Sequence, residues 1–172
     1  GLYGGKQDQY CAAYGGINAM QFKDGVVDVV GLKEDMLDAV YPNMVLFYLG
    51  ENRKSPKIQE GLKVISESQK SHLDTIKEIA IESITHIKDP QKIGELLDLS
   101  WRHKMKSNTN VSNEKLNEIY QKGLDLGAWG GKILGAGGGG HILFMCPQSK
   151  QTKLIENIGL KHIDFEIDQQ GV

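Results

Sequence analysis

Apolar residues recur at helical intervals through the middle of the chain. One stripe runs from Ile58 to Ile87 opposite a face rich in Glu and Lys, and Ser55-Pro56 is a typical start, so a single long helix is predicted. Asp89-Pro90 begins a second helix, and Ser112-Asn113 begins a third, which Gly127 ends. Such stripes face a core more often than a partner, so three packed helices are expected.

Short apolar runs around these helices predict strands. They cover residues 44–49, 131–134 and 141–146, and a short helix over 148–158 precedes a last strand over 161–167. The order strand, helices, strand, strand, helix, strand is that of a split βαβ unit. We therefore predict an α+β fold in which residues 44–172 form a ferredoxin-like domain with two extra helices in the first crossover.

Residues 1–43 do not fit this unit. A short helix over residues 7–14 is ended by Gly15-Gly16, and a hairpin follows in which residues 17–22 and 26–30 flank Lys23-Asp24-Gly25. The pattern from 31 to 43 is mixed, and Pro42 marks a domain boundary. Because the chain begins without Met in the middle of a motif, we interpret residues 1–43 as the end of a separate domain and the chain as a fragment.

Composition excludes several classes of protein. The net charge of -2 and the absence of a dense basic patch disfavour a nucleic-acid surface. Cys11 and Cys146 lie in unrelated contexts and the five histidines share no ligand spacing, so neither a disulfide framework nor a metal site is predicted. No apolar stretch approaches the length of a membrane span and no signal-peptide pattern is present, so we expect a cytoplasmic protein without membrane partners.

A glycine run between two predicted strands is the main candidate for chemistry. Residues 135–140 read Gly-Ala-Gly-Gly-Gly-Gly, and four consecutive glycines leave backbone N–H groups free to approach a phosphate. A Rossmann loop is disfavoured because an apolar strand, and no helix, follows the run. A Walker loop is disfavoured because Lys132 precedes the glycines and Ile133 follows that lysine. A flexible hairpin turn remains the alternative.

Three segments together resemble a known family. They are Gly-Lys-Gln-Asp-Gln-Tyr-Cys-Ala-Ala-Tyr-Gly-Gly over 5–16, Tyr-Leu-Gly-Glu-Asn-Arg over 48–53, and Lys-Ile-Leu-Gly-Ala-Gly-Gly-Gly-Gly over 132–140. In this order they resemble the GHMP kinases, and the first segment is most similar to the branch of heptose 7-phosphate kinases and related sugar-1-kinases. The resemblance implies that residues 1–43 end a ribosomal-S5-like N-terminal domain and that residues 44–172 form the C-terminal domain.

The resemblance also implies a reaction and its residues. The γ-phosphoryl group of ATP would pass to a sugar hydroxyl, and we expect the anomeric hydroxyl of a heptose 7-phosphate. Asp8 matches the catalytic aspartate, which would orient the hydroxyl and accept its proton. Alone, Asp8 also fits a carboxylate favoured at a helix N-terminus. The third motif would place backbone N–H donors near the developing charge, and it comprises Gly135, Ala136, Gly137, Gly138, Gly139 and Gly140.

Four further residues are candidates for support. Lys6 would hold Asp8 ionised or neutralise phosphate charge, and Gln7 lies in the same motif. Lys132 would supply a positive charge beside the glycine run, and Arg53 would bind the phosphate of the sugar through two hydrogen bonds. Lys6 and Arg53 also fit ordinary surface positions, and Lys132 also fits a structural role.

The expected ligands include ATP and Mg²⁺, held mainly by an N-terminal half that this sequence lacks. That half, ATP and a sugar or sugar phosphate are the expected partners, and the chain alone is expected to be inactive. Two alternatives stay open. One is a kinase with a fucose or galactose acceptor, and the other is a ferredoxin-like module that binds a ligand without catalysis.

Overall fold

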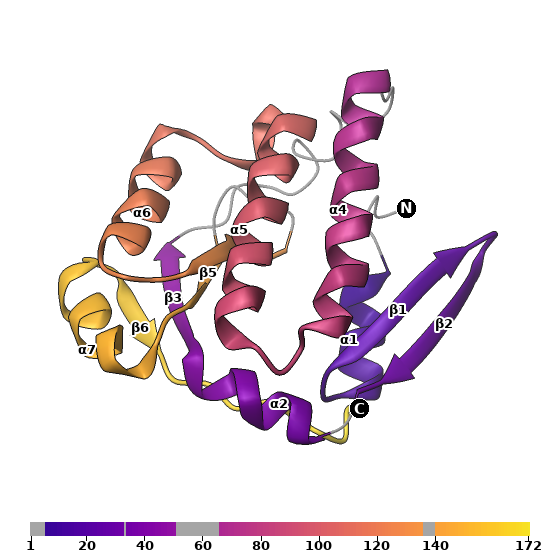
Figure 1. Cartoon of the computed structure of the whole chain (residues 1–172), viewed down its shortest axis with the longest axis horizontal. Coiled ribbons are helices and arrows are strands. Elements are labelled where there is room, and N and C mark those ends of the chain that lie inside the picture. The colour runs from indigo at the N-terminus through magenta and orange to yellow at the C-terminus, as the bar shows by residue number, and fades with distance from the viewer. Residues whose placement is uncertain (1–5, 33, 51–65, 136–139) are drawn as a thin grey trace.

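A four-stranded antiparallel sheet forms the centre of the computed structural model, which describes residues 6–32, 34–50, 66–135 and 140–172. The strand order is β4-β5-β3-β6, with β3 paired to both β5 and β6 (Figure 1). Helices separate β3 from β4, and one helix separates β5 from β6, so the predicted split βαβ arrangement is confirmed. The strands are β3 (Met44–Gly50), β4 (Gly130–Ile133), β5 (Gly140–Met145) and β6 (Lys161–Ile163).

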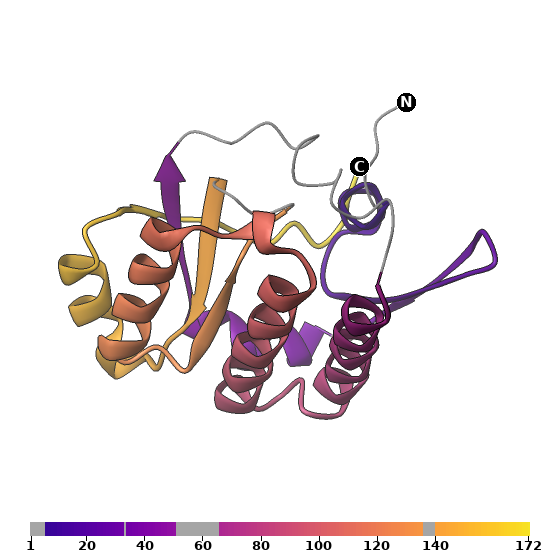
Figure 2. The same ribbon diagram turned by 90° about the horizontal axis from the view of Figure 1, so that it is seen from above.

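Helices cover one face of this sheet. Figure 2 shows α5 and α6 side by side along the sheet, with α4 packed on the outer side of α5. Asp89 caps α5 by accepting a hydrogen bond from the backbone of Lys92 at 3.0 Å, and Asn113 caps α6 in the same way, as the sequence predicts. The helices are α4 (Glu67–Thr85), α5 (Pro90–Ser107), α6 (Glu114–Asp125) and α7 (Gln148–Asn157).

Alternation along the two central strands supplies the core. Phe47 of β3 and Phe144 of β5 are fully buried on the helix-covered face, where their rings meet edge to face at 6.2 Å. Tyr120 of α6 lies beside Phe144, and its hydroxyl accepts a hydrogen bond from the backbone N–H of Gly131 at 3.2 Å. The same hydroxyl lies 2.9 Å from a carboxylate oxygen of Asp98 on α5. Tyr120 therefore joins α5, α6 and β4, and burial raises its pKa.

Two predicted elements differ from the structure. Ser66 is extended, its hydroxyl accepts a hydrogen bond from the backbone of Gln69, and the Gln69 side chain accepts one from the Ser66 N–H. This capping box starts α4 at Glu67, so the prediction of one continuous helix from Ser55-Pro56 is wrong, and residues 51–65 lie outside the described ones. The last strand ends at Ile163 instead of 167, because its pairing with β3 ends there.

The segment before β3 contains a helix that the mixed pattern from 31 to 43 did not predict. It is α2 (Glu34–Val40), followed by the 3-10 turn η1 (Tyr41–Asn43). Leu37 and Val40 are buried in a cluster with Ile93 of α5 and Met145 of β5. Residues 34–43 therefore pack on the sheet and on α5, while the predicted domain division at residue 43 stays a prediction.

The first elements project away from the sheet. Helix α1 (Gln7–Tyr14) ends at Gly15 and Gly16, both with φ of +62°, as the sequence predicts. The hairpin of β1 (Asn18–Lys23) and β2 (Val26–Gly31) turns through Asp24-Gly25 with positive φ at both residues, as an Asp-Gly turn predicts. Figure 1 shows the hairpin extending from the body. Helix α1 has no buried residue, and large apolar side chains of α1 and the hairpin are exposed.

The C-terminal tail, residues 168–172, returns to the end of α1. The backbone N–H of Gly16 donates to the carbonyl of Asp168 at 2.6 Å, and the N–H of Val172 donates to the carbonyl of Ala12 at 3.0 Å. Gly171 has a φ of +70°, and a Cβ there would lie 2.4 Å from the carbonyl oxygen of Ala13. Figure 2 shows the C-terminus beside α1. The tail therefore holds α1 by backbone contacts that require glycine.

Gly130→Ala tests the close approach of α5 to β4. A Cβ at Gly130 would lie 2.0 Å from the carbonyl oxygen of Gly94, and this backbone cannot yield as a side chain can. We expect the substitution to lower the free energy of unfolding by about 1–3 kcal/mol. Gly31→Ala is the matched control, since its nearest contact is 3.8 Å away, and its effect should stay within about 0.5 kcal/mol. Equal urea midpoints for the two variants would contradict the contact.

Gly171→Ala tests the attachment of the tail. The positive φ and the short distance to Ala13 should loosen the tail, so amides of α1 and of Gly15 and Gly16 should exchange faster in hydrogen-exchange mass spectrometry. Gly25→Ala is the control, because its φ is also positive but no atom lies within 4 Å of its Cβ position. It should leave exchange in α1 unchanged. Unaltered protection of α1 in Gly171→Ala would show that the tail does not hold it.

Candidate functional site

Three elements bring charged residues to the end of the sheet where β4 ends and β5 begins. Asp8 comes from α1, Lys132 from β4 and Lys104 from the last turn of α5. Burial lowers the pKa of both lysines, and the positive charge of Lys132 lowers that of Lys104 further, while the negative charge of Asp8 opposes both shifts. One carboxylate therefore lies within electrostatic reach of two ammonium groups that come from other parts of the fold.

Asp8 is exposed in the first turn of α1. Lys6 is the N-cap but its side chain makes no capping hydrogen bond, and Gln7 is the first helical residue. Both side chains are exposed as well. At this end of a helix the free backbone N–H groups favour anions, so the position suits a carboxylate and a negatively charged ligand. The structure thus places the three predicted residues of the first motif together and open to solvent.

Lys132 is half-buried on β4. Its neighbour Ile133 is fully buried on the helix-covered face, so the alternation of the strand directs Lys132 to the opposite face. Burial lowers the pKa of Lys132, and the charge of Asp8 opposes that shift. Among the described residues, its ammonium group has no hydrogen-bond partner and forms no ion pair within 4 Å.

Lys104 belongs to the site although the sequence analysis did not identify it. Its Nζ donates to the carbonyl of Gly135 at 3.0 Å and lies 5.8 Å from the ring centre of Trp101. Burial, with the charge of Lys132, lowers the pKa of Lys104 to about 8. The signal in the sequence was its position three residues after Trp101, which puts both on one helix face. Neighbouring Arg102 and Lys106 made it resemble a solvated charged face.

Glycines with left-handed backbone mark this end of the sheet. Gly135 has a φ of +69° after β4, Gly140 has +86° at the start of β5, and Gly50 has +99° at the end of β3. No atom of the described residues lies within 4 Å of the Cβ position of Gly135, so they leave its backbone open on that side. Strands flank the glycine run as predicted. Ala136, Gly137, Gly138, Gly139 and Arg53 lie outside the described residues, so their roles stay predictions.

The described residues do not form a magnesium site by themselves. They contain no group of three or more His, Cys, Asp or Glu side chains that could hold a metal ion. Within the described part of the chain, Asp8 is the one carboxylate whose charge acts on both Lys104 and Lys132. Hard divalent cations need several oxygen ligands, so these residues alone do not fit the ion.

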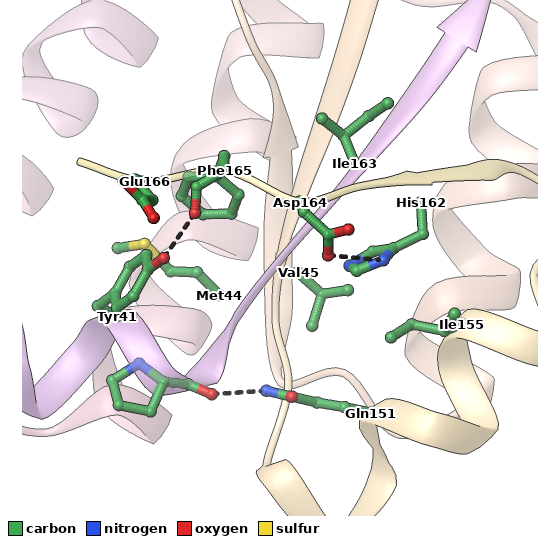
Figure 3. Close-up of a pocket in the computed structure, with 11 residues that line it drawn as sticks. Tyr41, Met44, Val45, Gln151, Ile155, His162, Ile163, Asp164, Phe165 and Glu166 are labelled. Atoms are coloured by element: carbon green, nitrogen blue, oxygen red, sulfur yellow. Dashed lines mark hydrogen bonds and ion pairs between the residues drawn. The ribbon is translucent and has the colours of Figure 1, made fainter. Parts of the chain in front are cut away.

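A cavity of about 760 Å³ lies elsewhere, beside β6 and the start of β3 (Figure 3). Several of its polar groups contact one another, since the Tyr41 hydroxyl donates to the carbonyl of Phe165 at 2.5 Å and His162 lies 3.6 Å from a carboxylate oxygen of Asp164. Gln151 likewise donates to the carbonyl of Pro42 at 2.7 Å. None of the predicted site residues lines it, so the lysine-bearing end of the sheet is the better candidate.

No described helix has both the length and the apolar composition needed to cross a membrane.

Comparison with known proteins identifies relatives of this chain. Residues 76–162 match the C-terminal domain of the GHMP kinases. The D-glycero-alpha-D-manno-heptose 7-phosphate kinase of Campylobacter jejuni is 32% identical over an alignment of 182 residues, which covers all of this chain and 54% of that enzyme. The mevalonate kinase of Pyrococcus abyssi is 32% identical over 122 residues, which cover 70% of this chain and 36% of that enzyme.

A solved structure agrees with these relatives. The crystal structure of a Campylobacter jejuni protein proposed to be a sugar kinase superposes with a TM-score of 0.71 and 30% identity, covering 99% of this chain and 51% of the other. The chain thus spans about half the length of that protein and of the heptose kinase. The match of residues 76–162, the split βαβ sheet and the glycine run between β4 and β5 together lead to one conclusion: the chain belongs to the GHMP kinase family.

Proposed function

We propose that the protein containing this chain is an ATP-dependent sugar kinase that phosphorylates the anomeric hydroxyl of a heptose 7-phosphate. The observation that carries the proposal is the similarity to a heptose 7-phosphate kinase along the whole chain, including the helix that bears Asp8. The exposed position of Asp8 beside two lysines supports it, because phosphoryl transfer needs a carboxylate near the acceptor and positive charge near the phosphate.

Asp8 acts as the base in this proposal. Its carboxylate binds the acceptor hydroxyl, orients a lone pair of the oxygen toward the γ-phosphorus and accepts the proton as the new O–P bond forms. The bond between the γ-phosphorus and the bridging oxygen breaks, and ADP leaves with that electron pair. The proton then passes from Asp8 to solvent. Lys6 and Gln7, exposed beside Asp8, are proposed to support its charge and position.

The glycine run and Arg53 act on phosphate groups in the same proposal. The backbone of residues 135–140 offers N–H groups to the charge that develops on the transferred group, and the open space at Gly135 is consistent with this role. Arg53 binds the phosphate that the sugar already carries. Guanidinium suits that group because it can donate two parallel hydrogen bonds to phosphate oxygens.

We propose that the N-terminal half of the same protein binds the Mg²⁺ and most of the ATP molecule. The protein is proposed to act in the cytoplasm. The share of the relatives that this chain spans supports the division between the two halves, as does the lack of a metal-binding cluster among residues that the structure describes. Exposed apolar side chains give that half a surface to cover, since burial of such groups is favourable. They are Tyr14, Phe22, Val26 and Val30, with exposed fractions between 50% and 61%.

The 172-residue chain alone should not turn over substrate. We expect no ADP formation from ATP and heptose 7-phosphate with this chain, and turnover with the product of the complete reading frame, because the proposed nucleotide site is divided between the halves. A coupled assay of ADP release with ³¹P NMR of the sugar product measures both. Turnover by the chain alone would contradict the division of the site, and inactivity of the complete protein toward every acceptor would favour a non-catalytic module.

Asp8→Asn in the complete protein tests the base. We expect kcat to fall by about 10²–10⁴-fold with little change in the KM of the sugar phosphate, because the amide still binds the hydroxyl but accepts no proton. Asp74→Asn is the matched control, since Asp74 is an exposed carboxylate on α4, and its kinetics should equal those of the parent protein.

The same assay identifies the acceptor. Heptose 7-phosphate, fucose, galactose and mevalonate are compared by kcat/KM, and the proposal requires the first to be preferred. Preference for another acceptor would contradict the proposed substrate but not the proposed kinase activity. Full activity of Asp8→Asn would contradict the role of Asp8 as the base, whatever the acceptor.

A further inference from the structure

Two lysines from different elements act on each other electrostatically at the end of the sheet near Gly135. Lys104 reaches Gly135 from the last turn of α5 and donates to its carbonyl at 3.0 Å, while Lys132 precedes it by three residues on β4. The two ammonium groups repel each other, since the charge of Lys132 lowers the pKa of Lys104. Holding two like charges together in a partly buried place is unfavourable unless an anion lies between them.

The described residues supply less negative charge than this arrangement needs. Two described lysines have a carboxylate partner, namely Lys88 with Asp35 and Lys92, whose Nζ lies 2.9 Å from an oxygen of Glu82. Neither Lys104 nor Lys132 is in any ion pair within 4 Å among the described residues. Asp8 is the carboxylate whose charge acts on both. One negative charge near two positive charges leaves room for an anionic ligand.

We propose that Lys104 and Lys132 together bind the phosphoryl group that is being transferred, next to the acceptor oxygen held by Asp8. This inference rests on the proposed kinase function and assigns to it a residue, Lys104, from outside the three motifs. The carbonyl of Gly135 orients the ammonium group of Lys104, and the Trp101 ring lies along its path from α5. The remaining N–H bonds of Lys104 are free to donate to phosphate oxygens.

The position of Asp8 selects the transferred group over the phosphate that the sugar already carries. A base must lie within about 3 Å of the oxygen whose proton it accepts, and that oxygen must lie about 3–3.5 Å from the phosphorus it attacks. Because the charge of Asp8 acts on both lysines, we assign the phosphate that they bind to the group in transfer. The phosphate on C7 lies at the other end of the sugar chain from the anomeric hydroxyl.

Two ammonium groups at this point would act mainly in the transition state. Charge spreads over the three outer oxygens of the phosphoryl group as the old bond breaks, and fixed positive charges stabilise it there. Both lysines are partly buried, which strengthens the interaction by excluding water. Loss of one of them should therefore change kcat more than the binding of the sugar.

The charge state of Lys104 provides a distinctive test. Burial and Lys132 lower its pKa to about 8, while Asp8 opposes the shift, so the free protein loses this charge as pH rises through 8. The lysine is required in its protonated form, so kcat/KM should fall on the alkaline side of that value. Arginine stays protonated throughout this range, so Lys104→Arg should move the fall to a pH above 9.

Steady-state kinetics of the complete protein between pH 6 and 10 compare four proteins. Lys104→Gln should lower kcat by about 10²-fold with the KM of the sugar phosphate changed less than about threefold. Lys104→Arg should keep more activity than Lys104→Gln and shift the alkaline limb. Lys106→Gln, an exposed lysine on the same helix, should match the parent protein. A rise in the KM of the sugar phosphate at constant kcat, or equal behaviour of Lys104→Gln and Lys106→Gln, overturns the proposal.

A binding measurement separates this inference from the kinase function. Side-chain NMR of lysines labelled with ¹³C and ¹⁵N follows Lys104 during titration of the complete protein with pyrophosphate. Its pKa should rise on binding, and Lys104→Gln and Lys132→Gln should each weaken binding at least tenfold, with Lys106→Gln unchanged. An active kinase whose Lys104 shows no response overturns only this inference. Pyrophosphate binding through both lysines without any kinase activity overturns the proposed function, and with it the assignment to a transferred group.

Discussion

The close approach of α5 to β4 is the constraint on which the site depends. Gly130 lies so near the carbonyl of Gly94 that no side chain fits between strand and helix. Lys104 follows Gly94 by ten residues of α5, which corresponds to a rise of about 15 Å along the helix axis. Gly135 follows Gly130 by five residues, which span about 16 Å in an extended chain. Because helix and strand leave the contact side by side and cover equal distances, the ammonium group meets the carbonyl at the end of the sheet.

Asp8, the carboxylate of the site, lies on a helix that is held in a different way from the lysines. Helix α1 has no buried residue, and its end is held by backbone hydrogen bonds to the C-terminal tail. Both ends of this chain therefore contribute to the position of Asp8, while the sheet and α5 position the lysines. A carboxylate on a lightly held helix faces cations on a well-packed core, an arrangement that allows the carboxylate to adjust to a substrate while the charges stay fixed.

Local signals predicted much of the fold, and their failures have physical causes. The caps at Asp89 and Asn113 and the Asp24-Gly25 turn act within four residues, so the sequence is sufficient to identify them. The capping box of Ser66 and Gln69 was equally visible, but the apolar stripe that continued across it favoured a single helix. Helix α2 was missed because its buried positions are fixed by contacts with α5 and β5 and not by a clear periodicity.

The sequence by itself determined the order of the strands and of most helices, the family resemblance and the identity of Asp8 and the glycine run as candidates. Tertiary structure decided that the tail reaches α1 and that Lys104 belongs to the site. The physical reason is the separation along the sequence of the residues that interact. Helix caps and turns depend on neighbours a few residues away, whereas Lys104 meets Gly135 across 31 positions, through the packing of a helix on a strand.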